Sequence, residues 1–324
     1  MSTAGGVPVL NCISKGIMTA NLERSQNVIV LGATGNVGFP VVKALATDPA
    51  QFKVTAVTRD KSKACFPPGV QVEESDLSQD SLRTIFKGQD AIVSCLSTSA
   101  IDQQKRIVNL AAECSVARFI PSEYGLDYSG PDAVKFFPVA KTKVEILEHI
   151  RTFEERMTWT TLVVGAFFDP MFGTPGLFGW SLPQRRLTVF DGGDVLFETT
   201  TFAQIGAVIA TILSPAHLKE TMNQTVYVNS FTTTQNEIAA AVGRITGKEL
   251  TKTHDTTAAL RERALIARDQ EPAGWGPISD LITASVYGQG DLNAYSQTAG
   301  KLWNDRLRMK QEDLVESIQK ALNM

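Results

Sequence analysis

The sequence predicts an α/β protein: a doubly wound parallel sheet followed by a smaller C-terminal lobe of mixed α+β structure. Strand-like and helix-like segments alternate from residue 27 onward, which is typical of successive β-α-β units. A glycine-rich turn joins the first strand to the first helix, and small hydroxyl-bearing residues follow two later strands. These observations predict right-handed crossovers and a ligand crevice along the carboxyl edge of the sheet.

The first strand and its turn are the strongest part of this prediction. Val28–Leu31 is an unbroken apolar run, as expected for a strand buried on both faces, and residues 40–46 are helix-like. Between them stands G-x-x-G-x-x-G, one residue longer than the common dinucleotide pattern. In a Rossmann-type fold such a turn opens the helix N-terminus to phosphates; a turn that binds nothing is the alternative. The expected cofactor contacts here are Gly32, Thr34, Gly35, Asn36, Val37 and Gly38.

The end of the second strand predicts which dinucleotide is bound. The strand covers Lys53–Thr58, and Arg59 follows it directly, with Lys61 and Lys63 close behind. This position faces the adenosine ribose in a doubly wound fold, where an acidic residue would suit a free 2′-hydroxyl. A guanidinium instead matches a phosphate bidentately, which favours NADPH over NADH. A solvated basic turn is the alternative interpretation.

Four further strands complete the predicted sheet, at residues 70–74, 90–96, 117–120 and 159–164. Amphipathic helices separate them, the clearest running from Ile101 to Cys114. Residues just beyond the carboxyl ends of these strands are expected to line the cofactor crevice, although solvated loops would have the same composition. The expected contacts are Asp76 near the adenine and Leu96, Ser97, Thr98, Ser122 and Phe167 toward the nicotinamide.

The helix predicted at residues 139–153 contains a lysine in an unusual position. On a helical wheel Lys143 falls in the middle of the apolar stripe, whereas Lys141 falls on nearly the opposite, polar side. A buried ammonium group must reach solvent, find a partner or take part in chemistry. Lys141 is explained as a surface residue, and Lys143 is not.

Aromatic residues gather after the predicted strand at residues 159–164. They could form a hydrophobic core or, at the carboxyl end of a strand, the wall of a substrate pocket, and the two interpretations have equal weight. The residues concerned are Phe168, Met171, Phe172, Phe178 and Trp180, and they would suit a flat apolar ligand.

The remainder of the chain predicts a mixed lobe. Asp191-Gly-Gly-Asp194 between residues 187–190 and 195–197 favours a β-hairpin. Thr234 and Glu237 form a capping box, and residues 251–324 are expected to be mainly helical. The predicted organisation is therefore an N-terminal extension (1–26), a dinucleotide-binding domain (27–166) and a mainly substrate-binding lobe (167–324), with a strand near 225–229 returning to the main sheet.

Composition narrows the function classes. The chain has 324 residues, a formal net charge of −3 and no basic block, so charge does not indicate binding to nucleic acid. No apolar run reaches the about 20 residues that span a bilayer. The four cysteines and three histidines are scattered, which predicts no metal site and reduced thiols in a cytoplasmic protein. The expected partner is a small-molecule substrate, and the oligomeric state is left open between monomer and homodimer.

Several motifs occur together in an order that resembles a known family. They are Gly32-Ala-Thr-Gly-Asn-Val-Gly38, Arg59, Asp102-Gln103, Arg118-Phe-Ile-Pro-Ser-Glu-Tyr-Gly125, Pro138-Val-Ala-Lys-Thr-Lys-Val144 and Trp159-Thr through Phe168. The chain resembles the NmrA-like, isoflavone-reductase-like group of atypical short-chain dehydrogenases over about residues 27–240. The resemblance implies an NADPH-dependent reductase of a small metabolite, aromatic or of polyketide or phenylpropanoid type, in secondary metabolism.

The resemblance also implies site residues. The group relies on one lysine in the helix after Pro-Ser-Glu, as acid/base or electrostatic stabiliser. Members with Val directly after the lysine select Lys143, other members would select Lys141, and the helical wheel agrees with Lys143. Glu123 is expected near the substrate. Tyr124 stands where most members have Phe, and it could donate a proton or simply pack as Phe would.

Two other function classes remain open from the sequence. The same scaffold could catalyse a non-redox step such as dehydration, cyclisation or isomerisation. It could also bind NADP without catalysis and act as a redox-sensing regulator, although an apparent active-site lysine counts against that.

Overall fold

The computed structural model describes residues 26–130, 133–138, 140–271, 274–288, 292 and 295–322. The expected N-terminal extension, apart from residue 26, lies outside this part of the chain. By its internal contacts the chain forms two compact units. Unit 1 contains residues 1–122, 145–161 and 205–225, and unit 2 contains residues 123–144, 162–204 and 226–324. Unit 2 thus takes in residues 123–144, which the sequence analysis places in the dinucleotide-binding domain.

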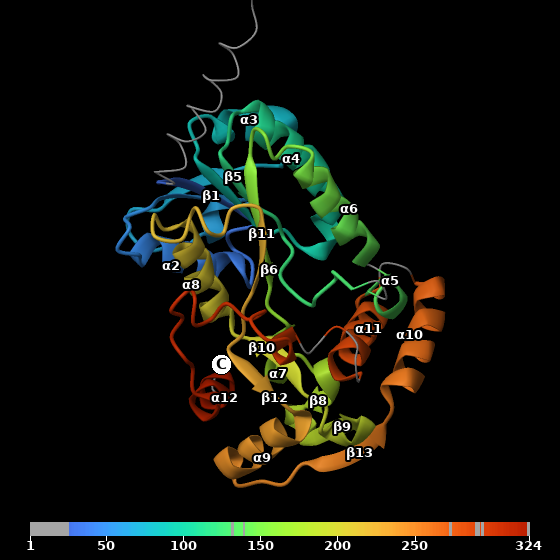
Figure 1. Cartoon of the computed structure of the whole chain (residues 1–324). Coiled ribbons are helices and arrows are strands. Elements are labelled where there is room, and N and C mark those ends of the chain that lie inside the picture. Colours follow the sequence, from blue (N-terminus) through green and yellow to red (C-terminus); the bar gives the residue numbers. More distant parts are fainter. Residues whose placement is uncertain are drawn as a thin grey trace, which may run out of the picture. The chain divides into compact units, whose positions relative to one another are not determined.

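The main sheet has seven strands in the order β11-β6-β5-β4-β1-β2-β3, and all the strand pairs from β6 to β3 are parallel (Figure 1). The chain order changes direction at β1, so ligands are expected beside the carboxyl ends of β1 and β4. The α/β prediction is confirmed. The strands are β1 (Asn27–Leu31), β2 (Lys53–Thr58), β3 (Gln71–Glu74), β4 (Ala91–Ser94), β5 (Arg118–Ile120), β6 (Thr158–Val163) and β11 (Gln224–Tyr227).

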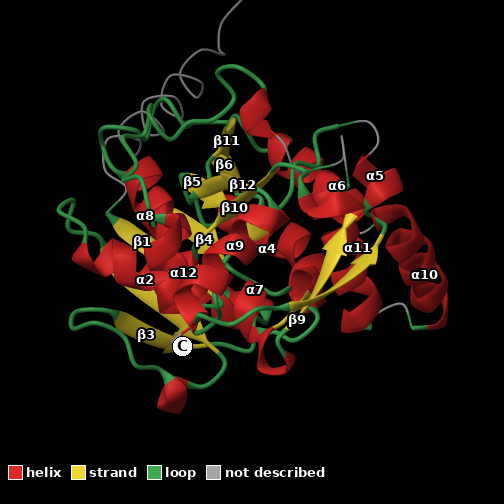
Figure 2. Ribbon diagram, turned by 90° about the horizontal axis from the view of Figure 1, so that it is seen from below, coloured by secondary structure: helices red, strands yellow, loops and turns green. Residues whose placement is uncertain are grey.

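Helices cover both faces of this sheet. On one face Ile29, Leu31 and Ile92 pack with side chains of α3, α4 and α6 in one apolar cluster. Elsewhere α2 packs against β1 and β2, and Gly206 of α8 lies against the backbone of Pro40, so α2 and α8 are neighbours in Figures 1 and 2. The helices are α2 (Gly38–Thr47), α3 (Gln79–Phe86), α4 (Gln104–Glu113), α6 (Ala140–Arg151) and α8 (Phe202–Leu213).

A buried arginine of β5 joins strand β6 and the segment between α8 and β11 through its hydrogen bonds. Arg118 is fully buried, and its guanidinium donates to the hydroxyls of Thr158 at 2.7 Å and Thr160 at 2.6 Å. It also donates to the carbonyl of Leu218 at 2.6 Å, in the segment between α8 and β11. Burial lowers the pKa of Arg118 to about 10, because desolvation disfavours the charged form. Neutral acceptors therefore stabilise a buried cation here.

Unit 2 is built on two three-stranded sheets and its own helices. The sheets have the orders β12-β10-β7 and β13-β9-β8. Its strands are β7 (Ala166–Phe167), β8 (Trp180–Ser181), β9 (Arg186–Phe190), β10 (Phe197–Thr200), β12 (Phe231–Thr233) and β13 (Thr251–Asp255). Its helices are α5 (Ala133–Phe136), α7 (Pro170–Gly173), α9 (Gln235–Thr246), α10 (Thr257–Gln270), α11 (Trp275–Tyr287) and α12 (Leu314–Leu322).

The prediction of a β-hairpin around Asp191–Asp194 is wrong. Strands β9 and β10 belong to different sheets, because the turn sends the chain away instead of back along β9. Gly192 and Gly193 both have positive φ, and the Asp191 side chain accepts a hydrogen bond from the backbone N–H of Thr257 at 3.1 Å. The turn is therefore fastened to the start of α10. Strand β13, which pairs with β9 in parallel, also replaces helix at the start of the region expected to be mainly helical.

Candidate functional site

The glycine turn of unit 1 has the geometry that the sequence predicts. Gly32 directly follows β1 with φ +71°, and a Cβ at this position would lie 2.5 Å from the carbonyl oxygen of Cys95. A Cβ on Gly38 would lie 2.1 Å from the carbonyl oxygen of Gly32. Only glycine fits either position, since real Cβ atoms do not approach within 3.0 Å of such atoms. The first turn of α2 can therefore lie directly against the end of β1.

The N-terminus of α2 is open to an anion. Val37 precedes the helix with no side-chain cap, and in α2, which the structure describes completely, the first turn holds no acidic residue. Thr34, Gly35 and Asn36 in front of it are exposed. Phe39 N–H already donates to the carbonyl oxygen of Gly35 at 2.9 Å, and Pro40 has no N–H. The feature that faces the loop is therefore mainly the positive end of the helix dipole, and no side chain caps this fully described segment. This cradle fits the pyrophosphate of a dinucleotide.

Arg59 is the unpaired cation at the end of β2. It is exposed, and within the described part of the chain no acidic group pairs with it. Lys61 differs, because its Nζ lies 3.7 Å from Glu73 Oε2 and its backbone N–H donates to Glu74 Oε2 at 3.0 Å. Arg59 is thus available for a 2′-phosphate, whereas Lys61 is partly neutralised. The side chain of Lys63 lies outside the described residues.

Hydrogen bonds join the segments that follow β4 and β5, where the nicotinamide ring of the cofactor is expected to bind. Ser122 Oγ donates to the carbonyl of Leu96 at 2.7 Å, and Ser122 N–H donates to Gln104 Oε1 at 2.8 Å. Gln104 is fully buried at the start of α4. Gln104 is not among the residues that the sequence predicted for the site. Its position at the start of the apolar stripe of α4, which continues through Ile107 and Val108, was the feature that could have indicated its burial.

The other residues expected to contact the cofactor differ in their exposure and in the unit to which they belong. Ser97 is exposed and begins the 3-10 helix after β4, whereas the side chain of Thr98 lies outside the described residues. Asp76 is exposed, and its pKa is lowered because Ser78 donates hydrogen bonds to its carboxylate. Phe167 belongs to unit 2, where its ring lies 5.2 Å from that of Phe202. The cofactor roles of all these residues stay predictions.

In unit 2, Lys143 has a buried acidic partner. Its Nζ lies 3.5 Å from Glu123 Oε2, and the two side chains are only 11% and 8% exposed. The Nζ also lies 5.5 Å from the centre of the Tyr128 ring, within the range of a cation–π interaction. Lys141, two residues earlier in α6, is exposed. The helix therefore has the polarity that the wheel predicts, with Lys143 on its sheltered side.

The Glu123 carboxyl group is poorly satisfied for a buried acid. Its Oε1 is inaccessible to solvent, and among the described residues no donor reaches it. Burial raises the pKa of Glu123, and the attraction to Lys143 offsets only part of this effect. Burial likewise raises the pKa of Tyr128. Tyr124, next to Glu123 in the chain, is 8% exposed, and its two expected roles both stay open.

The four aromatic residues and the methionine expected at a substrate pocket are buried in one apolar cluster of unit 2. Phe168 and Phe172 meet edge to face at 5.5 Å between ring centres, and Phe172 and Trp180 do so at 5.3 Å. Phe178 lies 6.2 Å from Tyr287, and Met171 is fully buried in the same cluster. Their packing gives all five a structural role, and their contact with a substrate stays a prediction.

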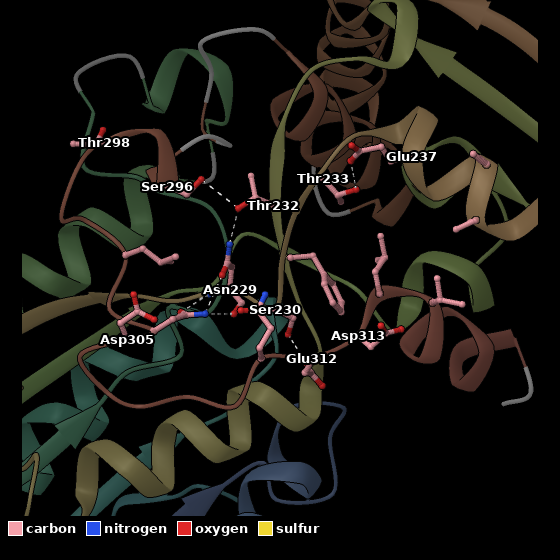
Figure 3. A pocket seen from close by; sticks show the side chains of 18 of the residues that line it. Asn229, Ser230, Thr232, Thr233, Glu237, Ser296, Thr298, Asp305, Glu312 and Asp313 are labelled. Carbon is pink, nitrogen blue, oxygen red and sulfur yellow. Dashed lines mark hydrogen bonds between the residues drawn. The ribbon is translucent and has the colours of Figure 1, made fainter.

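A polar groove of about 980 Å³ lies elsewhere in unit 2, between β12, α9 and the segments before and within α12 (Figure 3). Its polar side chains bond to one another: Ser230 Oγ donates to Glu312, and Thr233 Oγ1 donates to Glu237 Oε2 at 2.8 Å. Behind the groove, Asn229 Nδ2 donates to the buried Glu198 at 2.5 Å. These polar side chains therefore have hydrogen-bond partners within the lobe itself.

No group of three or more His, Cys, Asp and Glu side chains in the described part of the chain could hold a metal ion. No helix among the described residues is long and apolar enough to cross a membrane.

The sheet order, the glycine turn and the open helix N-terminus define an α/β protein of the Rossmann type with a dinucleotide-binding fingerprint. A family model described as the NmrA-like family matches residues 24–273. The chain belongs to this family, which confirms the resemblance seen in the sequence motifs.

Individual relatives agree with this assignment. The chain is 34% identical to oxidoreductase aprR of Aspergillus flavus over 227 residues, which are 68% of this chain and 74% of that protein. It is 27% identical to isoflavone reductase homolog P3 of Arabidopsis thaliana, over 84% of this chain and 89% of the relative. A solved complex of leucoanthocyanidin reductase with NADPH from Vitis vinifera has a TM-score of 0.74 at 17% identity, covering 92% of this chain and 100% of its own. This last likeness shows the fold.

Proposed function

We propose that this chain is an NADPH-dependent reductase of a small, aromatic or polyketide- or phenylpropanoid-like metabolite. The observation that carries the proposal is the anion cradle at the start of α2 together with the exposed Arg59 directly after β2, which has no acidic partner among the described residues. NADPH has two anionic groups, the pyrophosphate that it shares with NADH and the 2′-phosphate that NADH lacks, and the cradle and Arg59 suit them separately. The relatives named as an oxidoreductase and as an isoflavone reductase homolog support the reaction class.

Each residue has a role in this proposal. The backbone from Gly32 to Gly38 holds the pyrophosphate, and Arg59 holds the 2′-phosphate. Ser122, Leu96 and Ser97 fix the edge at which the nicotinamide would lie. When bound, NADPH supplies a hydride to an electrophilic carbon of the substrate. Lys143 then donates a proton to the atom that gains the electron pair, or stabilises its negative charge.

The chain sequence connects these two parts of the proposed site. Ser122 Oγ is bonded to the carbonyl of Leu96, just beyond β4, and the next residue along the chain is Glu123, the partner of Lys143. Ser122, at the predicted nicotinamide end, and Glu123, the partner of the proposed proton donor, are thus consecutive residues of the chain. This continuity supports Lys143 as the catalytic lysine.

Calorimetric titration with NADPH, NADP⁺, NADH and NAD⁺ tests the cofactor assignment. We expect NADPH to bind in the micromolar range and NADH much more weakly. Charge-assisted hydrogen bonds contribute about 1.5–3 kcal/mol, so Arg59→Ala should weaken NADPH binding about 10- to 100-fold and leave NADH nearly unchanged. Lys53→Ala is the matched control, because Lys53 is an exposed cation at the opposite end of the same strand.

The results of these titrations distinguish an NADPH-dependent reductase from the other possible functions. Binding of NADPH, with its preference over NADH lost in Arg59→Ala, would justify a screen of aromatic carbonyl and enone compounds for NADPH oxidation. Equal loss of NADPH and NADH binding in that variant would contradict the role given to Arg59. Absence of binding to all four dinucleotides would refute the reductase assignment.

A further inference from the structure

We propose that Glu123 carries a proton near neutral pH and is the positioning residue that resupplies the proton of Lys143. The inference rests on the proposed function for its catalytic meaning. Its physical part, the protonation of Glu123 and its coupling to Lys143, concerns unit 2 alone and can be tested without a cofactor or substrate.

The first reason is the number of hydrogen bonds that Glu123 receives. A buried carboxylate is usually stabilised by two or three donors, because each oxygen has lost its hydration. Here Oε2 has Lys143 Nζ at 3.5 Å, which is a long contact, and no donor among the described residues reaches Oε1. A neutral carboxyl group loses much less solvation on burial than a carboxylate does. The surroundings of Glu123 therefore favour its protonated form.

The second reason is the contrast with other buried acids of the same unit. Glu198 is equally buried, and its two oxygens accept from Asn229, Thr232 and Ser296. Glu312 is only half-buried, and it too accepts from Thr201, at 2.9 Å, and from Ser230. The fold thus supplies several donors where a carboxylate has a structural role. To Glu123, the described part of the chain supplies Lys143 on one oxygen and leaves the other without a donor.

The third reason is the composition of the surroundings. Lys143 on α6 faces Glu123, and Tyr128, a half-buried residue whose own pKa is raised by desolvation, lies beside Lys143. Desolvation raises the pKa of Glu123 from its ordinary value of 4.5, and the charge of Lys143 lowers it by less. The pair can therefore hold two protons, one on each member.

The proposed cycle balances as follows. An N–H bond of Lys143 breaks as its proton passes to the substrate atom that gains electrons, which leaves a neutral amine. The O–H bond of Glu123 then breaks and a new N–H bond forms on Lys143, which leaves an ion pair. Glu123 regains a proton from water before the next turnover. No oxidant or reductant beyond the NADPH of the proposed function is required.

Infrared difference spectroscopy of the full-length protein, without cofactor, tests the protonation. At about pH 6 we expect the carbonyl band of a protonated carboxyl group to be present in the wild type and missing in Glu123→Gln. In Lys143→Met the band should persist to higher pH, because the lowering effect of the ammonium charge is removed. Lys135→Met, at an exposed lysine of the same unit, should leave the wild-type titration unchanged. An unchanged band in Glu123→Gln, or an unchanged titration in Lys143→Met, would overturn the inference.

Carbon-13 labelling of glutamate side chains gives a second measurement that does not depend on the folding of Glu123→Gln. The carboxyl signal of Glu123 in the wild type should titrate above 4.5, and Lys143→Met should move its midpoint further up. A midpoint too low for Glu123 to carry a proton near neutral pH would refute the protonated state.

Kinetics then test the resupply, with the aromatic enone that gives the highest rate in the substrate screen as the probe. Glu123→Gln should retain a rapid first turnover, because Lys143 already holds its proton, and should lose about 10- to 100-fold in the steady-state rate. Glu123→Asp should restore part of that rate. Equal loss in the first and later turnovers would show that Glu123 has only a structural role. If the protein binds no dinucleotide but the spectroscopic results hold, the proton-sharing pair stands and the reductase assignment fails.

Discussion

Gly38 and Gly35, two glycines of the anion cradle, should respond differently to substitution by alanine. Gly38→Ala places a methyl group 2.1 Å from the carbonyl oxygen of Gly32 and 2.9 Å from Ala33 Cα. Both obstacles are backbone atoms, so no side-chain rotation relieves the clash. The carbonyl and the helix must separate by about 1 Å, and overpacking of this kind costs about 1–3 kcal/mol.

Gly35→Ala is the informative comparison. Its methyl group would lie 3.2 Å from the same carbonyl oxygen, which a shift of a few tenths of an ångström relieves. The fold should therefore tolerate it, and the free energy of unfolding should fall by less than about 1 kcal/mol. The methyl group would nevertheless point from an exposed loop in which a pyrophosphate is expected to approach the backbone.

Thermal unfolding and calorimetry together distinguish the two effects. Gly38→Ala should lower both the melting temperature and the affinity for NADPH, since a displacement of about 1 Å in a binding loop weakens contacts strongly. Gly35→Ala should lower the affinity about tenfold or more with little change in melting temperature. Gly243→Ala, within helix α9 and with no atom closer than 3.9 Å, should raise the melting temperature slightly and leave binding unchanged.

One result would refute the reasoning about the cradle. If Gly35→Ala binds NADPH as tightly as the wild type, the loop does not approach a phosphate at this position. The cofactor assignment would then rest on Arg59 alone.

Further predictions concern buried charges. Arg118→Ala should destabilise the protein by about 3–5 kcal/mol, seen in denaturant unfolding, because it leaves the acceptors around the guanidinium unpaired. Lys301 Nζ lies 2.5 Å from Asp127 Oδ2. Burial raises the pKa of Asp127, and the hydrogen bonds from Lys301 and Ser129 lower it by more, so the stability that the ion pair contributes is present above the ordinary pKa of Asp and lost as pH falls through the lowered value. Lys301→Met should therefore reduce the melting temperature at pH 7 and much less near pH 3. Lys143→Ala should cut turnover at least 100-fold while NADPH affinity stays nearly intact, and Lys141→Ala should retain turnover; the reverse pattern would move the catalytic role to Lys141.

Local sequence determined much of the sheet and its glycine turn. Val28–Leu31 can only be a doubly buried strand, and glycine at positions 32 and 38 allows a turn that any Cβ would block. The 3.6-residue period of α6 is sufficient to place Lys143 and Lys141 on opposite sides of the helix. These features depend on residues close in the chain, which is why a pattern reveals them.

Tertiary structure decided which distant groups meet. The hairpin expected at Asp191 failed because the start of α10, at Thr257, holds that turn, and no local signal reports such a contact. The acid that accompanies Lys143 comes from 20 residues earlier, and its missing hydrogen-bond donors become visible only when the whole surroundings of Glu123 are assembled. The sequence shows which side chains are able to exchange a proton, and the fold fixes their burial and partners, on which their protonation depends.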